Sequence, residues 1–120
     1  MSTASEETPL AGGGRTAVAR SGGVVHRQAG EWTPTVHALL RHLERAGFSA
    51  APRVAGSGFD RQGRETLTYI EGESVHPRAW SDEAVVVIGS MLRELHAATA
   101  SFRPASDARW RPWFGRALGG

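Results

Sequence analysis

Apolar side chains recur at helical spacing in the stretch that follows Thr33. Four of them lie three, one and three residues apart, which places them on one face of a helix over residues 34–46. They are Val36, Leu39, Leu40 and Leu43. Thr33 is a suitable cap for this helix, Pro34 suits its first position, and Gly47 can end it in a left-handed conformation.

A second apolar stripe of helical period predicts a longer helix over residues 81–101. Ser81 can cap it, and Asp82 and Glu83 would lie at the positive end of its dipole. The side chains of the stripe that we expect to be buried are those of Ala84, Ile88, Met91, Leu92, Leu95 and Thr99. Residues 102–120 combine prolines, tryptophans and glycines without any period, and we expect an irregular tail.

Short β-favouring runs separated by glycine turns predict antiparallel strands. Residues 16–20 and 24–28 flank a Ser-Gly-Gly turn and are typical of a hairpin, and residues 52–58 and 64–70 predict two further strands. The order is then hairpin, helix, two strands, connector and helix. Antiparallel strands with a helix against one face favour an α+β fold over alternating βαβ units.

Composition removes several classes of function. The 120 residues suffice for one domain, and the absence of cysteine excludes a disulfide scaffold, a cysteine-ligated zinc site and thiol catalysis. No apolar run is long enough to span a membrane, and Met1–Pro9 is polar and acidic, unlike a secretory signal, so we expect a cytoplasmic protein without a membrane partner. The formal charge is only +2 without a basic cluster, which argues against a nucleic-acid partner.

Three segments of the chain resemble the aminoglycoside phosphotransferase family, which has a protein-kinase-like fold. They are EWTPTVHALLRHLERAGFSAAPRV (31–54), RETLTYIEGE (64–73) and SMLRELHAATASF (90–102). The resemblance covers roughly residues 9–103 and implies ATP- or GTP-dependent phosphoryl transfer to a hydroxyl.

The same resemblance implies a division of the chain into three parts. Residues 1–8 would be a disordered leader, residues 9–73 a kinase-like small lobe, and residues 74–120 a connector, a helix and an irregular tail from an incomplete large lobe. The expected fold class is therefore α+β, a kinase-like small lobe followed by a long helix and a tail, and truncated.

Two features of the small lobe would hold the phosphates of the nucleotide. Gly12, Gly13 and Gly14 lie between the first two strands, where a loop must bring its N–H groups close to phosphate, although a flexible turn explains them equally well. Family members place a cation on the third strand, and with no lysine in the chain Arg27 or, in the adjacent register, His26 would serve. The alternative for Arg27 is a solvent-facing hairpin arginine.

Thr68, Tyr69 and Ile70 correspond to the hinge between the lobes, where backbone groups would bind the base; the alternative is an ordinary core strand. The helix that follows the hairpin normally supplies a glutamate to the strand cation. Here it offers His37 instead, either as an orienting partner or as a partly buried core histidine.

The motifs for catalysis and for metal binding are missing from these residues. Family members carry a catalytic Asp two positions after a His, and none of the five histidines has an Asp there. We therefore expect a chain truncated before the catalytic loop, inactive alone, with weak ATP binding, and with Mg²⁺ bound only if a complete large lobe is supplied.

Two other functions remain open. The first is a small interaction module that docks onto another polypeptide through an exposed apolar C-terminal half. Its expected patch consists of Leu92, Leu95, Phe102, Trp110, Trp113 and Phe114. The second is a nucleic-acid binder that uses Arg15, Arg20 and Arg27 of the hairpin.

Overall fold

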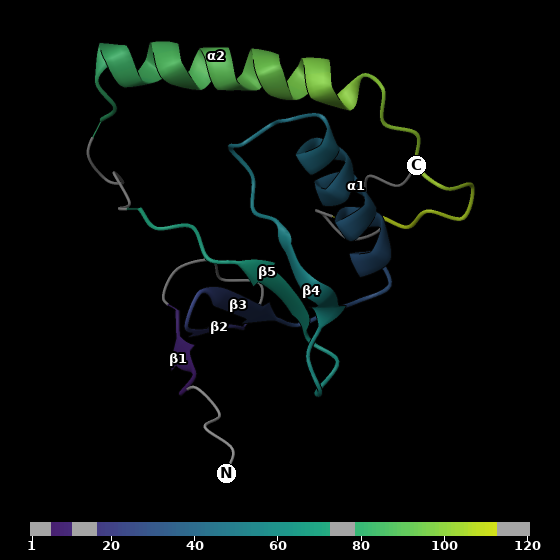
Figure 1. The fold of residues 1–120 in the computed structure, drawn as a ribbon. Helices are drawn as coiled ribbons and strands as arrows, with labels where there is room; N and C mark the ends of the chain where they lie inside the picture. Colours follow the sequence, from purple (N-terminus) through teal and green to yellow (C-terminus); the bar gives the residue numbers. More distant parts are fainter. Residues whose placement is uncertain (1–5, 11–16, 73–78, 113–120) are drawn as a thin grey trace.

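A five-stranded antiparallel sheet forms the body of the protein in the computed structural model, which describes residues 6–10, 17–72 and 79–112 (Figure 1). The strands lie in the order β1-β2-β3-β5-β4. Their bounds are Thr8–Pro9 for β1, Val18–Ser21 for β2, Val24–Arg27 for β3, Val54–Phe59 for β4 and Glu65–Thr68 for β5. The α+β class and the kinase-like small lobe predicted from the sequence are confirmed.

The predicted hairpin is formed by β2 and β3. Its turn contains Gly22 at a φ of +59°, a left-handed conformation that glycine adopts without a steric penalty. Val18 lies opposite Arg27, and Arg20 lies opposite Val25. The sheet also begins earlier than expected, because Thr8, which we assigned to the leader, pairs with Arg20 as part of β1.

Helix α1 spans Thr33–Arg45 and packs its apolar stripe against the sheet. The core consists of Leu40, Leu43, Phe48 and Leu67, with Val36, Leu39 and Val54 packed around it. Gly47 ends the helix at a φ of +80°, as predicted. The predicted cap is wrong, however: Thr33 is the first helical residue, and its buried hydroxyl accepts a hydrogen bond from the Gly30 N–H at 2.9 Å rather than from a helical N–H.

Helix α2 spans Asp82–Thr99 and crosses over α1 (Figure 1). Ser81 caps it as predicted, because its hydroxyl accepts a hydrogen bond from the Ala84 N–H at 3.1 Å. The predicted burial of its stripe is wrong, since none of its residues is buried. Only its C-terminal part reaches the core, through Leu95 and Ala98.

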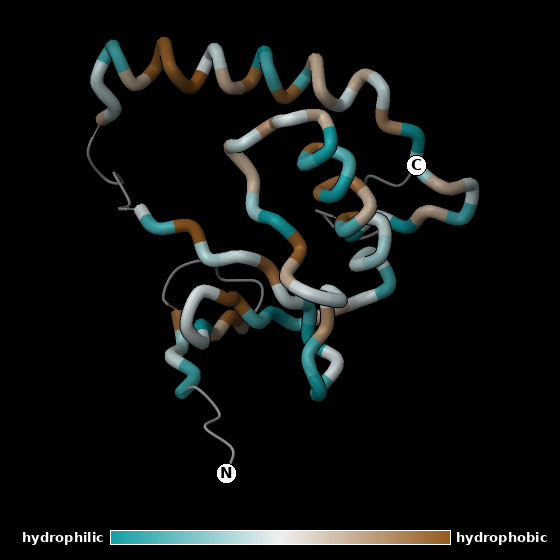
Figure 2. Tube along the Cα trace, viewed as in Figure 1, coloured by the Kyte–Doolittle hydropathy of each residue, from teal (hydrophilic) through white to brown (hydrophobic). Residues whose placement is uncertain are grey.

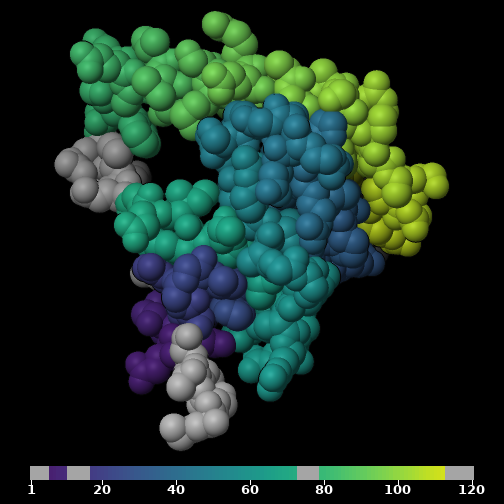
Figure 3. Space-filling view, viewed as in Figure 1, coloured from purple at the N-terminus to yellow at the C-terminus, as the bar shows by residue number. Residues whose placement is uncertain are grey.

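The N-terminal half of α2 is therefore an apolar helical segment whose surface is largely exposed. Figure 2 shows this half as a hydrophobic segment, and the space-filling view shows open space between it and the sheet (Figure 3). The exposed fraction is 56% for Val85, 69% for Val86 and 56% for Val87. None of the described helices is both long and apolar enough to cross a membrane.

The tail after α2 is irregular over its described part, as predicted, and it folds back onto α1. The Arg109 N–H donates a hydrogen bond to the Thr35 hydroxyl at 3.0 Å, and the Arg111 guanidinium lies 4.7 Å from the centre of the Trp32 ring. Of the patch expected from the sequence, Leu92 and Trp110 are exposed, whereas Leu95 and Phe102 are half-buried. Trp113 and Phe114 lie outside the described residues.

Candidate functional site

Alternation along β3 separates the two candidate cations onto opposite faces of the sheet. Arg27 points to the face that carries α1, where it meets Glu65 of β5. His26 points to the other face and meets Asp60. We call these the α1 face and the outer face. The register left open by the sequence therefore places Arg27, not His26, beside the helix.

The carboxylate of Glu65 lies at the centre of the α1-face site and is only 1% exposed. One of its oxygens, Oε2, accepts hydrogen bonds from Arg27, with N–O distances of 2.8 Å to Nε and 2.7 Å to a terminal nitrogen. The other oxygen, Oε1, lies 3.0 Å from Nε2 of His37. A buried carboxylate is tolerated only when its oxygens are paired in this way, and both are.

The Arg27 side chain is fixed by this carboxylate but remains 38% exposed. Arginine keeps its charge under all ordinary conditions and carries five donors in a planar fork. Two of its nitrogens contact Glu65. The site therefore presents a held cation at the surface of the α1 face, a geometry suited to an anion such as phosphate.

This pairing differs from the one expected from the sequence. The resemblance implied a carboxylate on the helix, whereas here the carboxylate comes from β5 and the helix contributes His37 to its far oxygen. No motif in the sequence predicted a role for Glu65. A signal was available in the pattern of the strand. Glu65 lies two residues before Leu67 and therefore shares its apolar face, and an acidic residue at such a position requires a buried partner.

His37 itself is held tightly between α1 and β4. It is 6% exposed, and its ring centre lies 5.2 Å from that of Phe59. Gly58 passes directly beneath the ring, where a Cβ atom would come within 2.7 Å of Cε1 and Nδ1. His37 thus combines the two expected roles, because it is a buried histidine and it orients the carboxylate that holds Arg27.

The three residues of the predicted hinge follow directly along β5. The Thr68 N–H donates to the Arg53 carbonyl at 2.8 Å, and the Tyr69 N–H donates to the Gly23 carbonyl at 2.9 Å. Within the described part of the chain, Ile70 has the only N–H of the three without an acceptor, and its residue is 58% exposed. A base at this position would therefore find one backbone donor, at Ile70.

The glycine run predicted to approach the phosphates, Gly12, Gly13 and Gly14, lies outside the described residues. The strands on either side of it are described. Because β1 ends at Pro9 and β2 begins at Val18, the run belongs to the connection between the first two strands, as expected.

The outer face carries a separate charged network. His26 Nδ1 lies 2.8 Å from Asp60 Oδ2, and the Arg64 Nε donates to the same oxygen at 2.9 Å. The terminal nitrogens of Arg64 donate to the carboxylate of Glu7, one of them at 3.0 Å. This arginine is therefore neutralised by two carboxylates.

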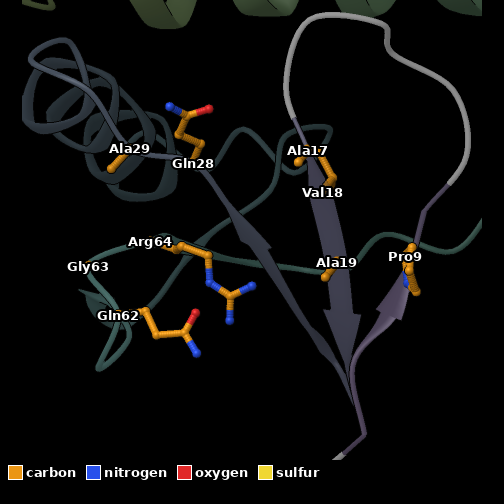
Figure 4. Close-up of a pocket in the computed structure, with 9 residues that line it drawn as sticks. All are labelled: Pro9, Ala17, Val18, Ala19, Gln28, Ala29, Gln62, Gly63 and Arg64. Atoms are coloured by element: carbon orange, nitrogen blue, oxygen red, sulfur yellow. The ribbon is translucent and has the colours of Figure 1, made fainter.

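An open hollow of about 460 Å³ lies beside this network, between β2, the end of β3 and the turn before β5 (Figure 4). Ala19 of β2 and Ala17, just before that strand, line it, and Gln28, Gln62 and Arg64 supply its polar groups. With Arg64 already paired to two carboxylates, the hollow offers no free cation among the described residues. The α1 face is therefore the better site for an anion.

The lowered pKa of the Asp60 carboxyl predicts how the stability of the fold depends on pH in acid. Partial burial raises its pKa, but hydrogen bonds from His26, from the backbone N–H groups of Arg64 and Gln62, and from the Arg64 side chain outweigh this and lower the pKa to about 2. A lowered pKa stabilises the fold above the unfolded-state value of 3.8, and this contribution is lost as the pH falls through about 2.

We therefore expect urea unfolding midpoints to fall between pH 4 and pH 2, and Asp60→Asn to flatten this dependence. The exposed Asp107→Asn is the control and should leave it unchanged. Equal slopes for wild type and Asp60→Asn would contradict the assignment.

The sheet order, the helix after β3 and the cation held on β3 together define the small lobe of a protein-kinase-like fold. The sequence profile of the phosphotransferase enzyme family matches residues 20–120, and the chain belongs to this family. The trifolitoxin immunity protein of Rhizobium leguminosarum bv. trifolii is 60% identical over 114 residues, which cover 95% of this chain and 44% of that protein. The chain thus spans less than half of this relative's length. No solved structure matches it.

Proposed function

We propose that this chain binds the triphosphate of a nucleotide on the α1 face of its sheet and that these 120 residues do not transfer phosphate by themselves. The observation that carries the proposal is the Arg27 guanidinium, which is held by the buried carboxylate of Glu65 yet is 38% exposed. A cation fixed in this way binds phosphate oxygens at little cost in side-chain entropy. We place this function in the cytoplasm, where nucleoside triphosphates are available.

Other groups on the α1 face support the same location. Val25 lies two residues before Arg27 and shares its face, so an apolar surface adjoins the cation. The N–H of Ile70, which has no acceptor among the described residues, lies just beyond the end of β5, and β5 neighbours β3. A nucleotide would place its base near Ile70 and its phosphates near Arg27.

The proposal that phosphate is not transferred rests on the chemistry of the side chains. Phosphoryl transfer in this family needs a carboxylate near the acceptor hydroxyl and usually ATP with Mg²⁺. Mg²⁺ prefers oxygen ligands, but both oxygens of Glu65, the carboxylate beside Arg27, are occupied by Arg27 and His37. The described residues of this site therefore do not fit a magnesium ion.

Arg27→Lys tests the proposed phosphate site. Lysine keeps the charge and the pairing with Glu65 but loses the planar fork, so we expect the affinity for nucleoside triphosphate to fall about tenfold. Isothermal titration calorimetry measures this, with Arg45→Lys at the exposed end of α1 as the matched control. If the wild type binds nucleoside triphosphate and Arg27→Lys binds it equally well, the phosphates do not lie at Arg27.

A second candidate function follows from the relative. Its name describes immunity to trifolitoxin, and identity of 60% over 95% of this chain favours a related role. We propose that the chain contributes to protection against a toxin of this kind. Expression in a trifolitoxin-sensitive strain tests this: improved growth on the toxin would support the role, and unchanged sensitivity with the protein present would refute it.

The polypeptide partner expected from the sequence remains a prediction. Its support is α2, in which no side chain is buried and three consecutive valines are more than half exposed. Exposed apolar surface of this kind is typical of protein contacts.

A further inference from the structure

A second arginine shares the α1 face with Arg27 and lies at the end where the base is expected. Arg20 of β2 pairs with Val25 of β3, two residues from Arg27 along the hairpin. Because alternate residues share a face, the side chains of Arg20, Val25 and Arg27 project from the same side of the sheet. The side chain of Arg20 reaches Tyr69, which belongs to the predicted hinge and follows β5 directly.

The plane of the Arg20 guanidinium is set by its neighbours. Its central carbon lies 3.6 Å from the centre of the Tyr69 ring, and its Nε donates to the Gly22 carbonyl at 2.7 Å. Arginine stacks on aromatic rings in this way because both groups are flat and the ring face is negative. The Nε bond and the stacking involve neither of the two terminal nitrogens in a hydrogen bond.

A carboxylate lies next to these terminal nitrogens. Oε1 of Glu71 is 3.9 Å from one of them, too far for a hydrogen bond, and Glu71 is 85% exposed. Within the described part of the chain, neither terminal nitrogen of Arg20 has a hydrogen-bond acceptor. A donor fork stacked on an aromatic ring and an acceptor carboxylate therefore lie close together, and within the described residues neither the terminal nitrogens nor the carboxylate forms a hydrogen bond.

We propose that this group selects guanine, so that the nucleotide of the proposed function is a guanine nucleotide. This rests on the proposed binding of a triphosphate at Arg27. Guanine presents two acceptors, O6 and N7, which match the fork of an arginine, and next to O6 it presents the N1–H and N2–H donors, which match a carboxylate. Arg20 and Glu71 offer these two complements in adjacent positions.

Adenine fits the same group poorly. Its exocyclic amine is a donor at the position where guanine has O6, and arginine has no acceptor to offer it. Its N1 has no hydrogen, so it would meet the Glu71 carboxylate with like polarity. Sites that hydrogen-bond one base well discriminate strongly against the other, because their polar groups are left unpaired.

The test is a calorimetric titration of the 120-residue chain with GTP, ITP and ATP. ITP keeps O6, N7 and N1–H but lacks the N2 amine. We expect GTP to bind about tenfold more tightly than ATP, with ITP between them. Arg20→Met should reduce the affinity for GTP to that for ATP while leaving ATP unchanged, and Glu71→Gln should weaken GTP more than ITP.

Two further variants separate the effect of the arginine fork from that of its charge. Arg20→Lys retains the charge but not the fork, so it should also lose the preference for GTP, and Arg61→Met, at an exposed arginine in the turn before β5, should retain it. Equal or tighter binding of ATP by the wild type, or a GTP preference that survives both Arg20 variants, would overturn the assignment of guanine and leave triphosphate binding intact. Failure of all three nucleotides to bind would overturn both proposals.

Discussion

Replacing Glu65 by alanine is expected to lower the free energy of unfolding by about 3–5 kcal/mol. The carboxylate is 1% exposed and joins Arg27 to His37, so its removal leaves the buried His37 nitrogen without a partner and opens a cavity beneath β5. Arg27 is partly exposed and can recover some hydration, so most of the loss comes from His37 and the cavity. Such a loss is a large share of the stability of a small domain.

Urea unfolding followed by circular dichroism measures this effect. Glu44→Ala is the matched control, because Glu44 lies exposed on α1, and it should change the unfolding free energy by less than about 0.5 kcal/mol. Glu65→Gln keeps the size of the side chain and should lie between the two. A Glu65→Ala protein as stable as the Glu44→Ala control would show that the buried pairing does not form.

Gly58→Ala is expected to destabilise the protein by about 2–4 kcal/mol. Gly58 has a φ of +92°, and a Cβ atom there would lie 2.7 Å from two atoms of the His37 ring and 3.0 Å from Val54 Cγ1. The buried ring has little room to move, because Phe59 packs against it and Glu65 bonds its Nε2. The substitution should therefore strain β4 and displace the His37 ring that bonds to Glu65.

A double-mutant cycle separates the clash from the backbone strain. In a His37→Ala background the ring is absent, so Gly58→Ala should cost only the strain of its positive φ and be milder than in the wild type. Gly63→Ala provides the backbone control, because Gly63 has a φ of +79° with nothing near its Cβ position. Equal costs in both backgrounds would mean that Gly58 and His37 do not interact.

The site connects α1 to the surface through a short chain of contacts. His37 of α1 touches Glu65 of β5, which holds Arg27 of β3. Among the described residues, the hydrogen-bonded link from the helix to the cation runs through the carboxylate. Substitutions that move α1 should therefore alter the presentation of Arg27 less than substitutions at Glu65.

Local patterns in the sequence predicted much of the fold. The stripe of α1, the glycine at its end and the glycine turn of the hairpin depend on neighbours within a few residues, and each is confirmed. The placement of Arg27 followed once the hairpin register was known, because register decides which face a side chain takes. Sequence alone left that register one residue uncertain.

The features that the sequence did not predict depend on contacts between distant residues. Glu65 pairs with His37 across 28 positions, and neither residue alone indicates the other. The apolar stripe of α2 has the same period as that of α1. Such a period predicts that a helix has an apolar face, but it does not predict whether another element covers that face. The missed cap at Thr33 has a local cause instead, because its hydroxyl accepts a hydrogen bond from the N–H of Gly30, three residues earlier, and not from a helical N–H.

Nuclear magnetic resonance with ¹⁵N-labelled protein tests the central claim, that a nucleoside triphosphate binds the α1 face at Arg27. Titration with GTP should shift the Arg27 Nε–H signal together with the amides of Val25 and Ile70, and guanosine without phosphates should shift Arg27 far less. Shifts confined to the outer-face hollow around Gln28 and Arg64, or an Arg27 signal unmoved at saturating nucleotide, would contradict the account.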